Sequence, residues 1–147
     1  IGVLVEGNCE TDFVGRTEGF QALIRDIAMH IAAAEPRFVR REEVTQDVLD
    51  RARDIYSEQV RAEGKPDHLV DRIVTGKMDK FYSQSVLLEQ PFVKNPDQTV
   101  QQMISEQIGS IGENIQVRRF ARFVMGEGLE KKQEDFAAEV AATISGT

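Results

Sequence analysis

The spacing of apolar residues divides the first part of the chain into a short strand and a long helix. Residues 1–5 are mostly β-branched and apolar, which is typical of a strand. Apolar residues then recur at helical spacing, which predicts one helix from Asp12 to Ala33. Pro36 follows the helix, and the residue before a proline avoids the helical conformation. The junction between strand and helix therefore falls at residues 11–13.

Two more helices are predicted in the middle of the chain. Thr45 is a suitable N-cap for a helix that ends near Gly64, which can adopt the left-handed conformation. Pro66 can open the next helical segment, whose apolar positions continue to Phe81. Gly76 weakens the middle of that segment, so a split into two shorter helices is an alternative.

An extended segment, a helix and a strand are predicted next. Residues 86–93 are too hydrophobic for an exposed loop, which indicates an extended segment packed on the core. Thr99 and Gln102 match a capping box, and the apolar stripe behind them predicts a helix that Gly112 stops. Residues 115–124 alternate partially between apolar and polar, which favours a strand.

The last segment is predicted to be a helix that docks outside the main core. Two glycines at 126 and 128 break the chain before it. Three apolar residues share one face of this helix: Leu129, Phe136 and Val140. Few strands among several helices predict an α+β fold, with a small antiparallel sheet of about three strands covered by several helices and a C-terminal helical appendage.

Composition excludes several classes of protein. The 147 residues suit one domain with its own core, and the formal net charge of -7 argues against a general nucleic-acid binder. The single Cys9 can form neither an internal disulfide nor a cysteine metal cluster, which favours a reducing compartment. No apolar run approaches the roughly 20 residues that cross a bilayer, so no membrane partner is expected.

The sequence carries no recognisable enzyme machinery. The phosphate-binding loop, the dinucleotide-binding glycine motif, the nucleophile elbow and the zinc-protease helix motif are all missing. His30 and His68 lie on different predicted helices without carboxylates or cysteines at ligand spacing. No base is identified near Cys9. We therefore predict no catalytic residues, no metal and no cofactor.

One basic cluster near the C-terminus admits two interpretations. Arg118, Arg119 and Arg122 interleave with Phe120 and Phe123, so an RNA-stacking surface is one hypothesis. The favoured interpretation pairs the arginines with nearby carboxylates and buries the aromatic rings in the core. No direct contact with nucleic acid is therefore expected.

The strand–helix junction also admits two interpretations. In the first, Thr11 or Asp12 caps the helix and Phe13 packs its first turn against the sheet. In the second, the acid and the neighbouring aromatic ring enter another protein. The physics of a single sequence favours capping and leaves both open.

The junction is also one of several motifs that together resemble the elongation factor Ts family. They occur in the family's order over essentially the whole chain. One short motif can match by chance, but this many motifs in the same order do not. The motifs are Asn8-Cys9-Glu10-Thr11-Asp12-Phe13-Val14, residues 28–33, 64–66 and 89–93, Ile111-Gly112-Glu113-Asn114-Ile115 followed by 118–120, and 126–128 with 135–140.

The resemblance implies a guanine nucleotide exchange factor that binds elongation factor Tu and promotes GDP release by disturbing the magnesium and phosphate site. Such a factor catalyses no bond chemistry. Phe13 would be the wedge inserted into the GTPase, with Asp12 beside it as a polar contact. The remaining contact residues implied by the family are Thr11, Val14, Ile111, Gly112, Phe136 and Val140.

The resemblance further implies one core module over residues 1–125 and a C-terminal helical module over 126–147. We expect the ubiquitin-associated-like N-terminal domain, the second core copy and the helical insertion of longer members to be absent from this chain. Single-module members can dimerise, so a homodimer is an open expectation. Bacterial cytoplasm is the expected location, with plastid stroma as the alternative.

Two rival hypotheses remain: a structural or ribosome-associated domain without exchange activity, and an RNA-binding module. The exchange-factor hypothesis makes one structural prediction of its own. The phenyl ring of Phe13 should be exposed in the unbound protein.

Overall fold

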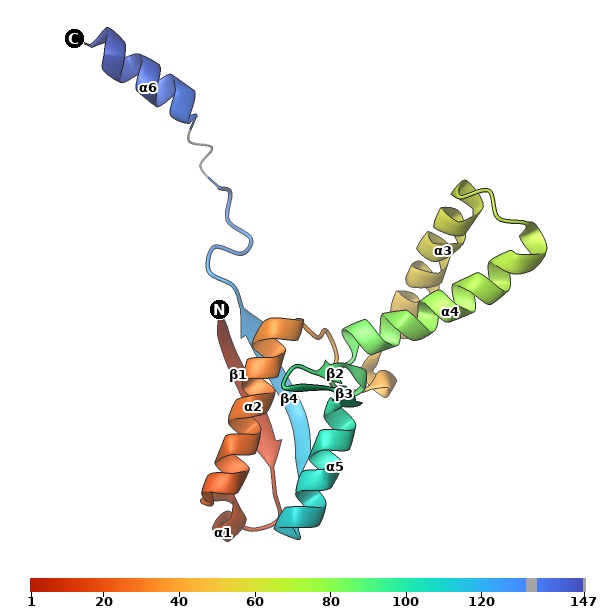
Figure 1. The fold of residues 1–147 in the computed structure, drawn as a ribbon, viewed down its shortest axis with the longest axis vertical. Helices are drawn as coiled ribbons and strands as arrows, with labels where there is room; N and C mark the ends of the chain where they lie inside the picture. The colour runs from red at the N-terminus through yellow and green to blue at the C-terminus, as the bar shows by residue number, and fades with distance from the viewer. Residues whose placement is uncertain (132–134, 147) are drawn as a thin grey trace.

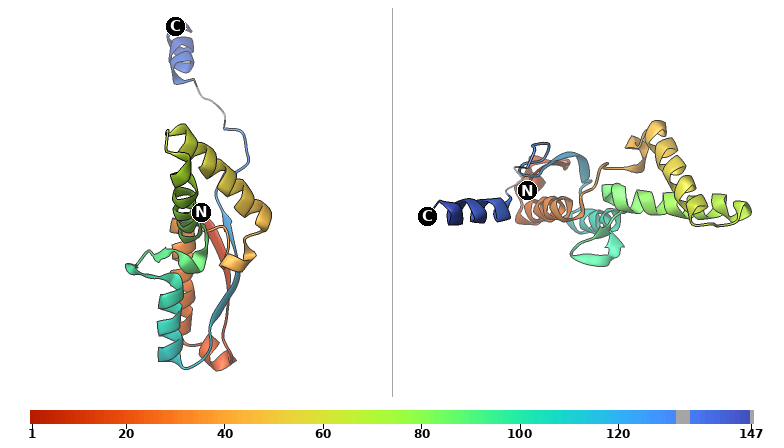
Figure 2. Two further views of the ribbon diagram at one scale, coloured as in Figure 1. Left: turned by 90° about the vertical axis from the view of Figure 1, so that its right-hand side faces the viewer. Right: turned by 90° about the horizontal axis from the view of Figure 1, so that it is seen from above.

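Two strands from opposite ends of the chain form the sheet on which the domain is built. The structure is a computed structural model, and it describes residues 1–131 and 135–146. Strand β1 (Gly2–Asn8) pairs antiparallel with β4 (Gln116–Phe123), with a register shift after Glu6 (Figure 1). Helices α2 (Glu18–Ala34) and α5 (Val100–Ile111) lie together on one face of this sheet (Figure 2). The sheet therefore has one covered face and one open face.

The single helix predicted over 12–33 is wrong, because the chain forms two helices there. The first is the one-turn helix α1 (Asp12–Gly15), and α2 begins only at Glu18. Thr17 separates them, since its side chain accepts a hydrogen bond from the Phe20 amide and donates one to the Val14 carbonyl at 2.6 Å. A second N-cap thus restarts the helix and leaves α1 as a separate turn.

The end of α2 is fixed by a residue from the sheet. Glu35, just before Pro36, has a left-handed backbone with φ of 49°, which is unusual for a residue other than glycine. Arg122 of β4 donates hydrogen bonds to the Ala32 carbonyl and, at 2.8 Å, to the Glu35 carboxylate. This arginine satisfies a helix-end carbonyl that lacks a partner within α2.

Helices α3 (Gln46–Ala62) and α4 (Asp67–Ser85) form a hairpin that projects from the sheet domain as an arm (Figure 1). Thr45 caps α3, and Gly64 has the predicted left-handed backbone with φ of 75°. The alternative split at Gly76 is wrong, since α4 is continuous. The arm has its own apolar cluster, built around the buried residues Val60, Val70, Val74 and Met78.

Short elements connect the arm to α2 on one side and to α5 on the other. A 3-10 turn, η1 (Arg41–Glu43), precedes α3, and another, η2 (Leu87–Glu89), follows α4. Strands β2 (Pro91–Phe92) and β3 (Asn95–Thr99) form a second antiparallel pair that leads into α5. The predicted capping box is confirmed, and α5 ends at a left-handed glycine. The α+β class is confirmed, with the strands of the described residues divided between two two-stranded sheets.

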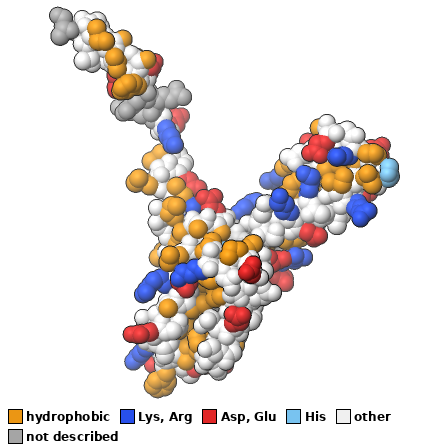
Figure 3. All heavy atoms as spheres, in the orientation of Figure 1, with side chains coloured by type: hydrophobic (Ala, Val, Ile, Leu, Met, Phe, Trp, Pro, Cys, Tyr) orange, Lys and Arg blue, Asp and Glu red, His pale blue; other side chains and the backbone are white. Residues whose placement is uncertain are grey.

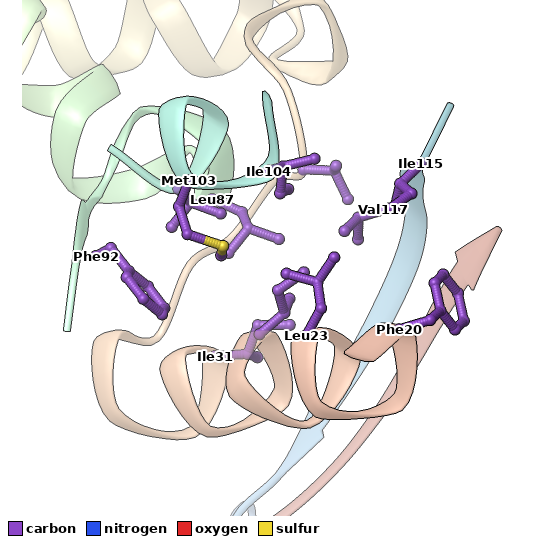
Figure 4. Packing of buried hydrophobic residues seen from close by; sticks show 12 residues of the cluster. Phe20, Leu23, Ile31, Leu87, Phe92, Met103, Ile104, Ile115 and Val117 are labelled. Carbon is purple, nitrogen blue, oxygen red and sulfur yellow. The ribbon is translucent and has the colours of Figure 1, made fainter. Parts of the chain in front are cut away.

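The core lies between the covered face of the sheet and the helices. Side chains of α2, α5, η2 and β4 meet there, and Leu23, Ile31, Leu87, Ile104 and Val117 are almost fully buried (Figure 4). Transfer of such side chains from water is the main source of stability, at about 1.5–3 kcal/mol for each. This packing fixes both ends of the loops that carry the candidate site.

One buried polar network accompanies the core. The His30 Nδ1 accepts a hydrogen bond from the Val93 amide at 3.2 Å, so the Nε2–H donates to Gln90 Oε1 at 2.9 Å. Gln90 in turn donates to the carbonyls of Ala34 and Gln84. Burial lowers the pKa of His30, and the Gln90 hydrogen bond opposes that shift. His30 is thus a structural residue.

The C-terminal helix α6 (Phe136–Ser145) lies beyond the end of β4, apart from the sheet domain (Figure 1). Asp135 caps it by accepting a hydrogen bond from the Ala138 amide. The prediction that Leu129 belongs to this helix is wrong, because α6 begins at Phe136. Residues 132–134, which that prediction also included, lie outside the described residues. Within the described part, no helix combines the length and apolarity needed to span a bilayer.

Candidate partner-binding site

The turn that contains α1 presents an aromatic ring to solvent. The Phe13 side chain is 79% exposed, which confirms the prediction and rules out the packing of its ring on the sheet. A hydrophobic group projects at the tip of the molecule at which α1 lies (Figure 3). Asp12, next to it, pairs with Arg16 at 3.2 Å, and both side chains are exposed. An acid and an exposed aromatic ring therefore stand side by side at this tip.

Thr11 caps α1, as predicted. Its side-chain oxygen accepts a hydrogen bond from the Val14 amide at 3.4 Å. Val14 itself turns inward and packs, partly buried, against the core. Thr11 and Val14 thus hold the turn in place, whereas Phe13 between them faces outward.

The loop after α5 holds the α1 turn through a single carboxylate. Glu113 Oε1 accepts hydrogen bonds from the amides of Glu10 at 3.1 Å and Thr11 at 2.9 Å. Its Oε2 accepts the Thr11 hydroxyl at 2.6 Å. In the opposite direction, the Glu10 carboxylate accepts the Asn114 amide at 3.0 Å. We call these four bonds the 10–114 clamp.

The electrostatics of the clamp agree with its geometry. The Thr11 hydroxyl bond lowers the pKa of Glu113 most strongly. Desolvation is the next largest effect and opposes that shift, and the amide bonds from Thr11 and Glu10 lower the pKa further. Gly112 gives the loop its shape, because its φ of 85° favours glycine. A carboxylate that remains ionised is thereby aimed at three donors on the neighbouring turn.

The structure brings together some of the predicted site residues and separates others. Ile111 and Gly112 precede Glu113 and so lie beside the α1 turn, with Ile111 partly buried against the core. Phe136 and Val140 lie on α6, at the other end of the molecule from α1 (Figure 1). Phe136 is 76% exposed, so its helix presents a separate apolar surface.

Sequence reasoning did not identify the roles of Glu10 and Glu113. Each lies within one of the recognised motifs, yet neither was singled out. One signal in the sequence could have indicated these roles: residues 1–5 and 115–124 are predicted strands of one sheet. The segment after the first strand, which contains Glu10, can then lie close to the segment before the second, which contains Glu113. Adjacent strands bring their connecting loops together, and a carboxylate in one loop can then reach the amides of the other.

The arginine cluster pairs with carboxylates, as favoured. Arg118 and Arg119 lie 3.4 Å and 3.5 Å from Glu6. Arg122, only 15% exposed, bonds to the end of α2. The prediction that both aromatic rings join the core is wrong for Phe123, which is 60% exposed. It lies three residues after Phe120, and an odd separation along a strand places side chains on opposite faces.

The open face of the β1–β4 sheet is a second apolar surface. Leu4 and Phe123 are its exposed apolar side chains, and Ala121 lies directly opposite Leu4. Glu6 and Arg119 form the adjacent charged pair. We call this surface the open sheet face.

Cys9, in contrast, is partly buried and donates to the Thr11 carbonyl.

No cluster of metal ligands is present among residues 1–131 and 135–146. The candidate surfaces described above are exposed apolar groups with adjacent charges, which suit contact with another protein.

Comparisons with known proteins agree on one family. The family model for Elongation factor TS matches residues 1–127. The chain is 62% identical to the Elongation factor Ts of Geobacter sulfurreducens over 142 residues, which are 97% of this chain and 66% of that protein. It is 61% identical to that of Geotalea uraniireducens over 142 residues, again 97% and 66%. With that of Heliobacterium modesticaldum it shares 57% identity over 145 residues, 99% of this chain and 67% of that protein. The chain thus spans about two thirds of the length of these relatives.

Proposed function

The chain belongs to the elongation factor Ts family, and on this premise we propose that it binds elongation factor Tu and promotes the release of GDP. The observation that carries the proposal is the exposed ring of Phe13 on a turn held by the 10–114 clamp. A large apolar side chain exposed on an ordered turn is suited to burial in a partner. The surface needs no nucleotide or metal site of its own.

Phe13 acts in this proposal as a wedge between helices of the GTPase near its bound magnesium ion. A GTPase holds its nucleotide through the β-phosphate and Mg²⁺, so a partner that favours the disturbed arrangement of that site accelerates release. Asp12 is the polar contact beside the wedge. Thr11, Val14, Ile111 and Gly112 shape and flank the same contact surface.

The coupling between the two ligands of the GTPase is reciprocal. If this chain weakens nucleotide binding by a given factor, nucleotide weakens binding of the chain by the same factor. A weakening of about 10⁴ requires about 5.5 kcal/mol of differential binding. Burial of one Phe side chain supplies about 1.5–3 kcal/mol. Phe13 therefore needs help from at least one other surface.

Two exposed apolar surfaces are candidates for that help. The first is α6, with Phe136 and Val140, and the second is the open sheet face. The structure favours neither, since each is exposed in the unbound chain. A second copy of the chain is the alternative occupant of the open sheet face, in keeping with the expectation of a homodimer.

The rival functions have less support. The RNA hypothesis needs free arginines, whereas Arg118, Arg119 and Arg122 each have a carboxylate within 3.5 Å. A structural domain without exchange activity gives no reason to present Phe13 to solvent. The relatives named above are bacterial proteins, which favours bacterial cytoplasm as the proposed location.

The direct test measures the release of fluorescent GDP from elongation factor Tu in the presence of excess unlabelled GDP and increasing amounts of this chain. We expect the release rate to rise with the concentration of the chain and then saturate. Removal of Mg²⁺ with a chelator should raise the spontaneous rate and shrink the stimulation, because the chain and the chelator disturb the same site.

Three results would count against the proposal. Binding to elongation factor Tu without stimulation would favour the structural domain. Salt-sensitive RNA affinity without binding to elongation factor Tu would favour the RNA-binding module. A stimulation factor that is the same with and without Mg²⁺ would leave exchange activity in place but refute the proposed route through the magnesium site.

A further inference from the structure

We propose that Glu113 is a positioning residue for nucleotide exchange, which holds the turn before Phe13 in the conformation that the partner recognises. This inference rests on the proposed function. Glu113 lies 102 residues after Thr11 in the sequence, so the contact exists only in the folded domain. It does not touch the partner in this proposal and acts through Thr11.

The clamp requires a carboxylate for a geometric reason. Three donors converge on Glu113: the amides of Glu10 and Thr11 reach one oxygen, and the Thr11 hydroxyl reaches the other. A carboxylate accepts at both oxygens, whereas an amide side chain accepts at one oxygen and offers hydrogens at the other end. Hydrogen bonds to an ionised acceptor are also about twice as strong as neutral ones.

The Thr11 hydroxyl connects the clamp to α1. It has one hydrogen, which is donated to Glu113, so its lone pairs are left to accept the Val14 amide. Glu113 thus fixes the direction of the hydroxyl and thereby completes the N-cap of the helix that carries Phe13. Phe13 lies between Thr11 and Val14, so both ends of its turn are held.

The expected consequence is a change in apparent affinity. Without the clamp the α1 turn samples other conformations, and the apparent dissociation constant rises in inverse proportion to the fraction that is competent to bind. The rate at saturation should stay close to that of the unmodified chain, because the bound state contains the same wedge. A residue that contacts the transition state directly would instead lower the saturated rate.

The experiment compares Glu113→Ala and Glu113→Gln with the unmodified chain in the GDP-release assay, over a full concentration series. We expect the half-saturating concentration to rise about 10-fold for Glu113→Ala and about 3-fold for Glu113→Gln, which keeps one acceptor oxygen. Glu106→Gln is the matched control, because Glu106 is an exposed carboxylate on α5, and it should leave both constants unchanged.

A structural readout accompanies the kinetic one. Hydrogen exchange measured by NMR should show faster exchange of the Glu10 and Thr11 amides in Glu113→Ala, with the core amides of α2 and α5 still protected. Unchanged exchange at both amides would overturn the inference, since it would show that Glu113 does not hold the turn. If Glu113→Ala loses hydrogen-exchange protection throughout the domain, the variant is unfolded, and the exchange of the Glu10 and Thr11 amides is measured in Glu113→Gln instead.

The kinetic outcomes separate this inference from the proposed function. An unmodified chain that gives no stimulation refutes the proposed function and this inference with it. Stimulation that is equal for the unmodified chain and both variants refutes this inference alone. A lowered saturated rate with an unchanged half-saturating concentration also overturns it, because Glu113 would then be a direct contact.

Discussion

Replacement of Phe13 by alanine should impair exchange while leaving the free protein stable. The side chain is 79% exposed, so the folded chain loses little packing, and the free energy of unfolding should change by less than about 0.5 kcal/mol. In the complex the ring is proposed to be buried, which contributes about 1.5–3 kcal/mol. Since about 1.4 kcal/mol corresponds to a factor of ten, the expected loss of exchange efficiency is about 10- to 150-fold.

The assay is the second-order rate constant for stimulated GDP release, measured below saturation for the unmodified chain and for Phe13→Ala. Urea unfolding of both proteins measures stability in parallel. Ile55→Ala is the matched control, because Ile55 is an apolar side chain on α3 that is 48% exposed and lies in the arm. It should change exchange efficiency by less than about 2-fold, within the effect of an ordinary surface substitution.

Two results would refute this reasoning. Equal exchange efficiency for Phe13→Ala and the unmodified chain would show that the ring is not the wedge, even though the family assignment stands. A loss of more than about 2 kcal/mol in the free energy of unfolding would be typical of a packed side chain instead. That result would contradict the exposed position on which the proposal depends.

Three further predictions concern the scaffold. Burial lowers the pKa of His30 from its ordinary 6.5, so the imidazole binds a proton more readily in the unfolded chain than in the folded one. The free energy of unfolding should therefore fall as pH drops below 6.5. A free energy of unfolding in urea that stays constant over that pH range would contradict this prediction. Gly7→Ala would place a Cβ in steric conflict with the side chain of Ile24 on α2 and should cost about 1–3 kcal/mol in chemical denaturation. Gly2→Ala, with open space around it, should cost less than about 0.5 kcal/mol. Arg122→Ala removes the hydrogen bonds to the end of α2 and should lower the free energy of unfolding by about 1–3 kcal/mol. Arg118 is exposed, so an equal loss for Arg118→Ala would contradict the capping role of Arg122.

Local signals in the sequence predicted the elements whose ends are set by caps. Thr99 with Gln102 and the left-handed Gly112 set the bounds of α5, and Thr45 sets the start of α3. The same kind of signal was missed at Thr17, because the apolar spacing continues across it as though the helix were unbroken. A threonine within a periodic stretch is compatible with helix interior or N-cap, and only its contact with the Val14 carbonyl decides.

Tertiary placement was the part that periodicity could not supply. Apolar positions on α3 and α4 predicted helices correctly, but a stripe that packs on a partner helix looks the same as one that packs on a sheet. The arm is therefore visible only in the structure. The 10–114 clamp is a similar case, since the sequence shows Glu113 as an ordinary acidic residue and cannot show that its oxygens meet donors from residues 10 and 11.

The site combines an exposed ring with a rigid support, and the two features serve different parts of binding. Because Phe13 is exposed before binding, nearly all of its transfer from water can contribute to affinity for the partner. Because Glu113 holds the turn in the free chain, less conformational entropy is lost when the partner binds. A buried ring would contribute nothing new on binding, and an unsupported ring would lose part of its contribution to ordering. Exposure of the Phe13 side chain and restraint of the backbone are therefore both needed at residues 11–13.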